Sequence, residues 1–138
     1  MTGPATVRRP PGFTVAAGAF YTCTAGVHVG IVATDPQAYA TFAQASLWSW
    51  VRTAWQEVFM AHPTLWGLFA AGLEIFLGVL LLTGGRPAQL GWVGIIAFQL
   101  ALIPLAWQLL FWSIPAAVVL TLGARHDWPR LTPARTWT

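Results

Sequence analysis

The stretch TLWGLFAAGLEIFLGVLLLT, residues 64–83, has the apolarity of a membrane-spanning helix. At ~1.5 Å of rise per residue it matches the ~30 Å hydrocarbon core of a bilayer. One ionisable residue, Glu74, lies near its midpoint. A carboxyl group at that depth costs about 2.5–3.5 kcal/mol on insertion scales, so it normally faces protein or trapped water. We therefore expect the rest of the chain to pack around Glu74.

Small residues flank this acid at helical intervals. Gly67, Ala71, Glu74 and Gly78 are separated by four, three and four residues, which places them on one stripe of the helix. Small residues allow neighbouring helices to approach closely in a membrane. The stripe therefore predicts that Glu74 faces another helix of a bundle.

The composition is that of an integral membrane protein. Hydrophobic residues make up 57% of the 138 residues and charged residues only 8%, which is outside the usual range of soluble domains. The net charge of +3 comes from dispersed arginines that form no patch, so nucleic acid is not predicted as a partner. The single cysteine, Cys23, excludes an internal disulfide.

Three further spans are predicted from the remaining apolar stretches. Residues 13–33 carry no charge and are long enough to cross the membrane. The chain is also uncharged over 88–123, where a single helix would measure about 54 Å. We therefore expect two spans there, about 88–104 and 108–123, with the reversal near Pro104.

The segment between the first two spans has a different pattern. Over about 36–60 apolar residues recur at three- and four-residue intervals, and Trp48, Trp50 and Trp55 lie among them. This pattern predicts one amphipathic helix lying in the membrane interface. The sequence as a whole predicts an all-α membrane protein: a four-transmembrane-helix bundle with an interfacial amphipathic helix between spans one and two.

Four spans place both ends of the chain, residues 1–12 and 124–138, on one side of the membrane. Most of the arginines would share that side, namely Arg8, Arg9, Arg86, Arg125, Arg130 and Arg135. Only Arg52 would lie opposite. The positive-inside rule makes the shared side cytoplasmic. Because the arginine-only, Ala/Gly/Pro/Trp-rich composition is typical of a GC-rich bacterium, we expect a multi-pass protein of the bacterial cytoplasmic (inner) membrane.

Four polar side chains form a candidate intramembrane site. Glu74 and Gln99 are near the midplane of spans two and three, while Tyr21 and His28 share one face of span one. A buried acid needs a hydrogen-bond partner or a proton. One interpretation is a pocket that binds a small ligand or relays protons. The other is a protonated Glu74 that bonds a neighbouring helix as structural glue.

His28 has an alternative role as a ligand to haem or chlorophyll. Intramembrane haem usually requires two facing histidines. Of the others, His62 is at the outer end of span two and His126 is on the cytoplasmic tail, so a pair of His28 and His62, both in the outer leaflet, is the one that stays open. The spacing therefore does not favour haem or chlorophyll, whereas quinone or lipid stays open as a ligand. No P-loop, dinucleotide fingerprint, HExxH, nucleophile elbow or paired metal-ligand motif is present, so neither soluble-type catalysis nor a metal site is predicted.

Two stretches, AGVHVGIVATDPQAY at 25–39 and AAGLEIFLGVLLLTGG at 70–85, resemble the DoxX-like family of small four-helix membrane proteins. In that family a Gly-x-His-type end of the first span precedes a proline and an aromatic residue, and a small-Gly-x-Glu-x-x-x-Gly segment follows. The matching positions here are Gly26, His28, Pro36, Tyr39, Gly72, Glu74 and Gly78. The resemblance implies a small membrane subunit beside a redox partner. Family members are associated with thiosulfate:quinone oxidoreduction, maturation of periplasmic redox enzymes and oxidative-stress complexes.

These observations favour an accessory or structural subunit that packs against a larger, redox or respiratory membrane complex. Its partners would be other integral membrane subunits and the lipid bilayer. One alternative is a DoxX-like, quinone-linked oxidoreductase subunit with a polar intramembrane site around Glu74. Another is a cofactor-binding subunit that uses His28 to hold haem or a pigment.

Overall fold

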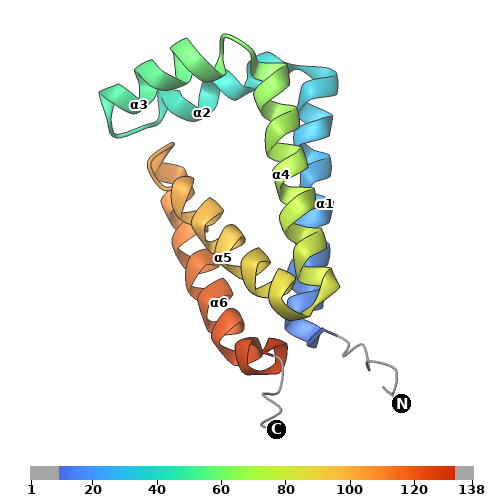
Figure 1. Cartoon of the computed structure of the whole chain (residues 1–138). Helices are drawn as coiled ribbons and strands as arrows, with labels where there is room; N and C mark the ends of the chain where they lie inside the picture. The colour runs from blue at the N-terminus through green and yellow to red at the C-terminus, as the bar shows by residue number, and fades with distance from the viewer. Residues whose placement is uncertain (1–9, 133–138) are drawn as a thin grey trace, which may run out of the picture.

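The computed structural model describes residues 10–132, and all regular structure within them is helical. Four long helices dominate: α1 (Gly12–Thr34), α4 (Pro63–Thr83), α5 (Gly85–Ala101) and α6 (Trp107–Leu131). α1 runs beside α4, and α5 runs beside α6 (Figure 1). α1 begins and α6 ends at the same end of the molecule, which we call the terminal end. The opposite end, where α1 ends, is called the arm end.

Three of these helices, α1, α4 and α6, are long and apolar enough to cross a membrane. The fourth, α5, has 17 residues and so a length of about 25 Å, somewhat less than a typical hydrocarbon core. The outward faces of the helices expose large apolar side chains, as lipid contact requires. The protein is therefore all-helical with three candidate membrane spans, and a crossing by α5 stays a prediction.

Buried positions in the long helices recur at alternating intervals of four and three residues. In α4 they include Gly67, Ala71, Glu74, Gly78 and Leu81. The other helices follow the same spacing, with Thr14, Gly18, Tyr21 and Ala25 in α1, Ala88, Trp92, Ile95 and Gln99 in α5, and Ser113, Ala117, Leu120, Ala124, Asp127 and Leu131 in α6. A mean spacing of about 3.5 residues keeps one seam of each helix facing inward. The predicted stripe around Glu74 is thus one of four such seams.

Helices α1 and α4 approach each other closely at two facing glycines. A Cβ atom added to Gly78 would lie 2.7 Å from the Gly18 carbonyl oxygen and would overlap the Thr22 hydroxyl. A Cβ on Gly18 would lie 2.9 Å from the Gly78 carbonyl oxygen. Only glycine permits this separation, because any side chain would push the two backbones apart.

A single residue, Gly84, connects α4 to α5. Its φ of 74° and the φ of 59° at Gly85 lie in the left-handed region, which glycine adopts without steric cost. The chain therefore reverses without a loop, and α5 packs directly against α4.

The segment between α1 and α4 differs from the single interfacial helix expected over about 36–60. It consists of four short pieces, η1 (Pro36–Tyr39), α2 (Ala40–Gln44), α3 (Ser49–Ala54) and the π-helical turn η2 (Trp55–Phe59). We call residues 36–59 the arm. It extends sideways from the α1–α4 pair toward the turn between α5 and α6 (Figure 1).

The arm breaks at Ser46, between α2 and α3, where the serine bonds to a segment outside the arm. Its hydroxyl donates to the Pro104 carbonyl oxygen at 2.8 Å, while its own carbonyl accepts from the Arg52 guanidinium at 2.6 Å. Nearby, the Trp107 N–H donates to the Ala45 carbonyl oxygen at 3.2 Å. Such side-chain bonds compete with helical ones, and here they tie the arm to the α5–α6 turn.

The last helix also differs from the expected span of 108–123, because α6 continues to Leu131. The buried seam continues with it through Asp127, so tertiary packing stabilises the segment assigned to a polar tail. Residues 1–9 and 133–138, with Arg8, Arg9 and Arg135, lie outside the described residues.

Candidate functional site

His28, Glu74 and Tyr39 meet toward the arm end, where one imidazole lies between a phenol and a carboxyl group. His28 Nδ1 is 2.7 Å from Tyr39 Oη, and the two rings are stacked with centroids 5.9 Å apart. His28 Nε2 is 3.9 Å from Glu74 Oε1. The three side chains come from α1, α4 and η1, so both helices and the arm are needed to assemble them.

The three groups differ in exposure. Glu74 and Tyr39 are only 5% and 2% exposed, whereas the His28 side chain is 25% exposed. The second carboxyl oxygen of Glu74, Oε2, is buried and has no hydrogen-bond partner among the described residues. Burial raises the pKa of the Tyr39 phenol above its usual value, and the negative charge of Glu74 adds to this effect. Tyr39 therefore keeps its proton at neutral pH.

The arm and α4 fix Tyr39 over the imidazole. Trp55 Nε1 donates to the Tyr39 carbonyl oxygen at 3.0 Å, and the Phe59 ring packs 5.1 Å from the Tyr39 ring. On the α4 side, a Cβ atom at Gly67 would lie 2.9 Å from the Tyr39 ring. The phenol thus occupies space that only a glycine leaves free.

Tyr21 and Gln99 form a separate pair deeper in the bundle. Tyr21 donates to Gln99 Oε1 at 3.2 Å, and both side chains are buried. Gln99 Nε2 and the Ser113 hydroxyl are also buried, and neither has a hydrogen-bond partner among the described residues. The four residues predicted from the sequence thus form two pairs, His28 with Glu74 and Tyr21 with Gln99.

The Tyr21–Gln99 bond repeats a second bond between the same helices. Trp92 Nε1 donates to the Thr14 hydroxyl at 3.3 Å. Thr14 is seven residues before Tyr21 in α1, and Trp92 is seven residues before Gln99 in α5. α1 and α5 leave the terminal end in the same direction, so the seven-residue repeat keeps both pairs in register.

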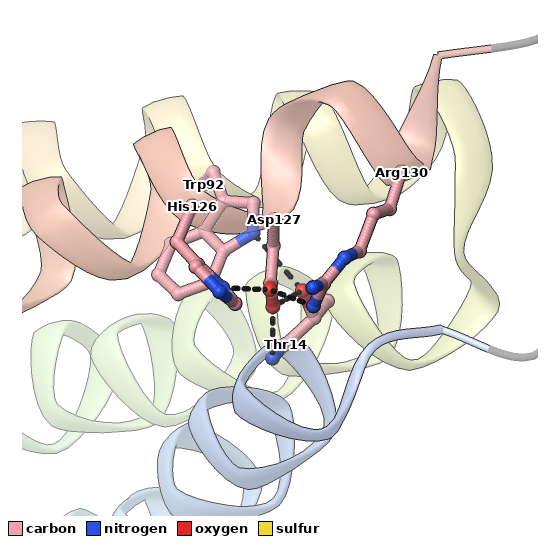
Figure 2. Close-up of polar contacts among 5 residues, drawn as sticks. All are labelled: Thr14, Trp92, His126, Asp127 and Arg130. Carbon is pink, nitrogen blue, oxygen red and sulfur yellow. Dashed lines mark hydrogen bonds and ion pairs between the residues drawn. The ribbon is translucent and has the colours of Figure 1, made fainter.

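Sequence reasoning missed a third polar cluster, at the terminal end (Figure 2). Asp127 of α6 is 1% exposed. Its Oδ2 accepts from the Thr14 N–H at 2.9 Å and from the Thr14 hydroxyl at 2.7 Å. Its Oδ1 accepts from His126 Nδ1 at 2.9 Å and lies 3.6 Å from a guanidinium nitrogen of Arg130. We call these residues, with Trp92, the Asp127 cluster.

Asp127 serves as a distant cap for α1. Thr14 is in the first turn of that helix, where backbone N–H groups have no partner within the helix. The carboxylate also places a negative charge at the positive end of the helix dipole. The sequence did contain a signal, because Ser113, Leu120 and Asp127 are seven residues apart and so share the buried seam of α6.

The cofactor hypotheses depend mainly on His28. Both of its ring nitrogens face protein groups, Tyr39 and Glu74, so an iron or magnesium ligand bond would displace one of them. His62 and Cys23 are exposed. Within residues 10–132, no three His, Cys, Asp or Glu side chains are grouped to hold a metal ion.

An apolar groove of about 470 Å³ separates α1 from α6 on the outer surface. Its walls include Phe13, Phe20, Trp112 and Leu120, and Tyr21 lies at its inner side. The volume is within the ~300–1,000 Å³ range of small-molecule sites.

No protein-family model, curated protein or solved structure matches this chain. The resemblance to the DoxX-like family accordingly stays a prediction.

Proposed function

We propose that this chain crosses the bacterial inner membrane four times, with both termini in the cytoplasm. Support for α5 as the fourth span comes from the lack of charge between Ala88 and Gly123. A bilayer can thin slightly around a helix of about 25 Å at modest cost. Arg86, Arg125 and Arg130 are all at the terminal end, which is the distribution that the positive-inside rule associates with the cytoplasm.

We infer that the protein is an accessory subunit of a larger redox or respiratory membrane complex, and that it handles protons for that complex. The observation that carries this inference is the position of His28 between Glu74 and Tyr39, with one ring nitrogen facing each. Imidazole takes up a proton on one nitrogen and releases one from the other near physiological pH. An ionisable residue inside a membrane is by default a candidate for such a relay.

In this proposal Glu74 is the inner proton acceptor and donor. A proton that leaves its carboxyl group binds His28 Nε2, and Tyr39 Oη accepts a hydrogen bond from the Nδ1–H of the resulting imidazolium. The Nδ1 proton then passes to the Tyr39 hydroxyl, which releases its own proton toward the arm end, so that His28 returns to the neutral form. The Nε2–Oε1 separation of 3.9 Å exceeds hydrogen-bond reach, so transfer requires a side-chain rotation or one bridging water.

Infrared spectroscopy of the full-length protein in membranes tests this role of Glu74. We expect a protonated-carboxyl band that changes between acidic and alkaline buffer and that is lost in Glu74→Gln. Glu57→Gln, which changes an exposed carboxyl group of the arm, is the matched control and should keep the band. A Glu74 band that does not respond to pH would make Glu74 structural glue instead.

A purely structural subunit is the second candidate, favoured by the surface of the arm. Leu47, Trp50 and Val58 are 65%, 66% and 56% exposed, and large exposed apolar side chains are typical of docking or membrane-contact surfaces. The native mass after mild solubilisation, with the co-migrating chains identified, tests the accessory role. Migration as a free monomer would contradict both forms of the subunit proposal.

The quinone-linked alternative is supported by the groove between α1 and α6, because it reaches Tyr21. The purified wild-type protein should then contain bound quinone, and the Tyr21→Ala variant should retain less of it.

The haem or pigment alternative using His28 predicts a visible absorption band in the purified protein, and a spectrum without such a band would eliminate it.

A further inference from the structure

The terminal end of the molecule combines exposed positive charge with an almost complete lack of exposed negative charge. Arg86 in the first turn of α5 and Arg125, His126 and Arg130 of α6 are all exposed. The chain has four acidic residues, and Asp127 is the one at this end. Its carboxylate is 1% exposed and already accepts bonds from Thr14 and His126. The three arginines therefore face the surroundings without an exposed acidic side chain among the described residues at this end.

The last two turns of α6 place two of these arginines and His126 on one half of the helix. At about 100° per residue, Arg125 and Arg130 are about 140° apart, with His126 between them. Asp127 points away from this half, into the bundle. The surface formed by Arg125, His126 and Arg130 is called the basic face.

Each group of the basic face keeps donors available for a ligand. Only one nitrogen of Arg130 is near Asp127, at 3.6 Å, which leaves the other N–H groups of its planar fork free. His126 holds Asp127 through Nδ1, so its Nε2 is not used by that contact. The side chains of His126 and Arg130 are 63% and 60% exposed.

The depth of the basic face matches that of lipid headgroups. Arg125 and Arg130 follow the end of the apolar stretch at Gly123 by two and seven residues, which is roughly 3–10 Å of helix. The headgroup region of a bilayer extends over a similar distance from the hydrocarbon core. Trp128, on the same turns, is 39% exposed, and tryptophan is enriched at this level.

We propose that the basic face binds the phosphate group of an anionic glycerophospholipid. Arg130 and Arg125 would donate charge-assisted hydrogen bonds to the phosphate oxygens, which arginine recognises in a bidentate geometry. The bound lipid also holds Arg130 and His126 beside Asp127, and so stabilises the contact between α6 and the first turn of α1. This proposal depends on the membrane location of the terminal end and is independent of proton handling at Glu74.

The test uses the full-length protein in bilayer nanodiscs that contain phosphatidylglycerol and phosphatidylcholine in equal amounts. Native mass spectrometry of the released protein gives the ratio of the two retained lipids. We expect wild type to retain mainly phosphatidylglycerol. Arg130→Gln should lower the ratio about fivefold, the effect typical of one basic residue near an anionic surface. Because this change also touches Asp127, Arg125→Gln, which has no contact with that carboxylate, should lower the ratio similarly.

Arg52→Gln is the matched control, since it removes one positive charge at the arm end. It should leave the lipid ratio unchanged. The thermal unfolding midpoint of wild type should be higher in phosphatidylglycerol than in phosphatidylcholine, and this difference should shrink in Arg125→Gln. Equal retention of both lipids by wild type would overturn the proposal. So would an equal loss in Arg52→Gln, which would indicate a general charge effect.

Discussion

Thr14 is the residue on which the terminal end depends most directly. Its N–H and hydroxyl both donate to Asp127, and its hydroxyl oxygen accepts from Trp92. One small side chain therefore connects α1, α5 and α6. The hydrogen bonds of Thr14 are formed with residues that are 78 and 113 positions away in the sequence. No short sequence motif therefore reveals these bonds.

Replacing Thr14 by valine keeps the shape of the side chain and removes both hydroxyl bonds. We expect a loss of about 1–3 kcal/mol in the free energy of unfolding, because Trp92 Nε1 and part of the Asp127 carboxylate become unpaired. Unfolding by sodium dodecyl sulfate in mixed micelles measures the change. Thr41→Val, at an exposed hydroxyl of the arm that bonds only the carbonyl oxygen of Ala38, three residues earlier, should alter the unfolding free energy by less than about 0.5 kcal/mol.

Tyr39 gives a second residue-scale prediction, for the proposed relay. In Tyr39→Phe the ring remains packed against Phe59, but the hydroxyl oxygen next to His28 Nδ1 is lost. The imidazolium then loses its hydrogen-bond acceptor, so the pH-dependent infrared band of Glu74 should persist while proton exchange slows. Time-resolved spectra after a pH jump measure the rate. An unchanged rate would remove Tyr39 from the relay.

At the scale of elements, the pairing of α1 with α4 depends on the absence of side chains where the helices cross. Gly78→Ala should separate them and cost about 1–3 kcal/mol, the usual range for overpacking. Gly72→Ala on the same helix is the control, since a Cβ there meets nothing within 4 Å. The same micelle unfolding assay compares the two. Because alanine has a higher helix propensity than glycine, Gly72→Ala should not destabilise the protein, and similar losses in both variants would mean that the crossing is not responsible.

The arm gives the other element-scale prediction. Ser46→Ala removes the bond to the Pro104 carbonyl oxygen, so the arm should detach more often from the α5–α6 turn. We expect faster amide hydrogen exchange over residues 40–54, with little change in α1 or α4. Ser49→Ala, at an exposed serine, should leave the exchange unchanged.

These two elements also show what the sequence predicts well and what it does not. The stripe containing Gly67, Glu74 and Gly78 is a property of one helix, so its periodicity is sufficient to predict which face is buried. The break in the arm depends on Ser46 reaching Pro104, a contact between segments far apart in the chain. Periodicity within the arm contains no information about that partner, and a continuous helix was therefore expected.

At the scale of the whole molecule, the same distinction applies to the candidate site. Helical periodicity and estimated depth in the membrane predicted Glu74, His28, Tyr21 and Gln99 as a candidate polar site, but their division into two pairs depends on how the helices are rotated and offset. Asp127 was missed because the polar residues around it outweigh the seven-residue repeat to which it belongs. The local composition around Asp127 favours a polar tail, whereas tertiary packing places this residue on the buried face of α6.

The number of membrane crossings can be tested by thiol labelling of intact cells. With Cys23→Ala as background, Arg86→Cys and Gln108→Cys place single thiols at exposed positions on either side of α5. If α5 crosses, an impermeant reagent should label position 108 in intact cells and position 86 only after lysis. Labelling of both positions from one side would mean that α5 does not cross, and the four-span proposal would be wrong.

The bond between Thr14 and Asp127 also has a consequence for biosynthesis. Its partners are 113 residues apart, and at a translation rate of ~5–20 residues per second the second follows the first by roughly 6–23 seconds. During that interval the first turn of α1 has no cap. A nascent chain that stalls before Asp127 lacks the contact between its first and last helices, so this end of the bundle closes only when synthesis is nearly complete.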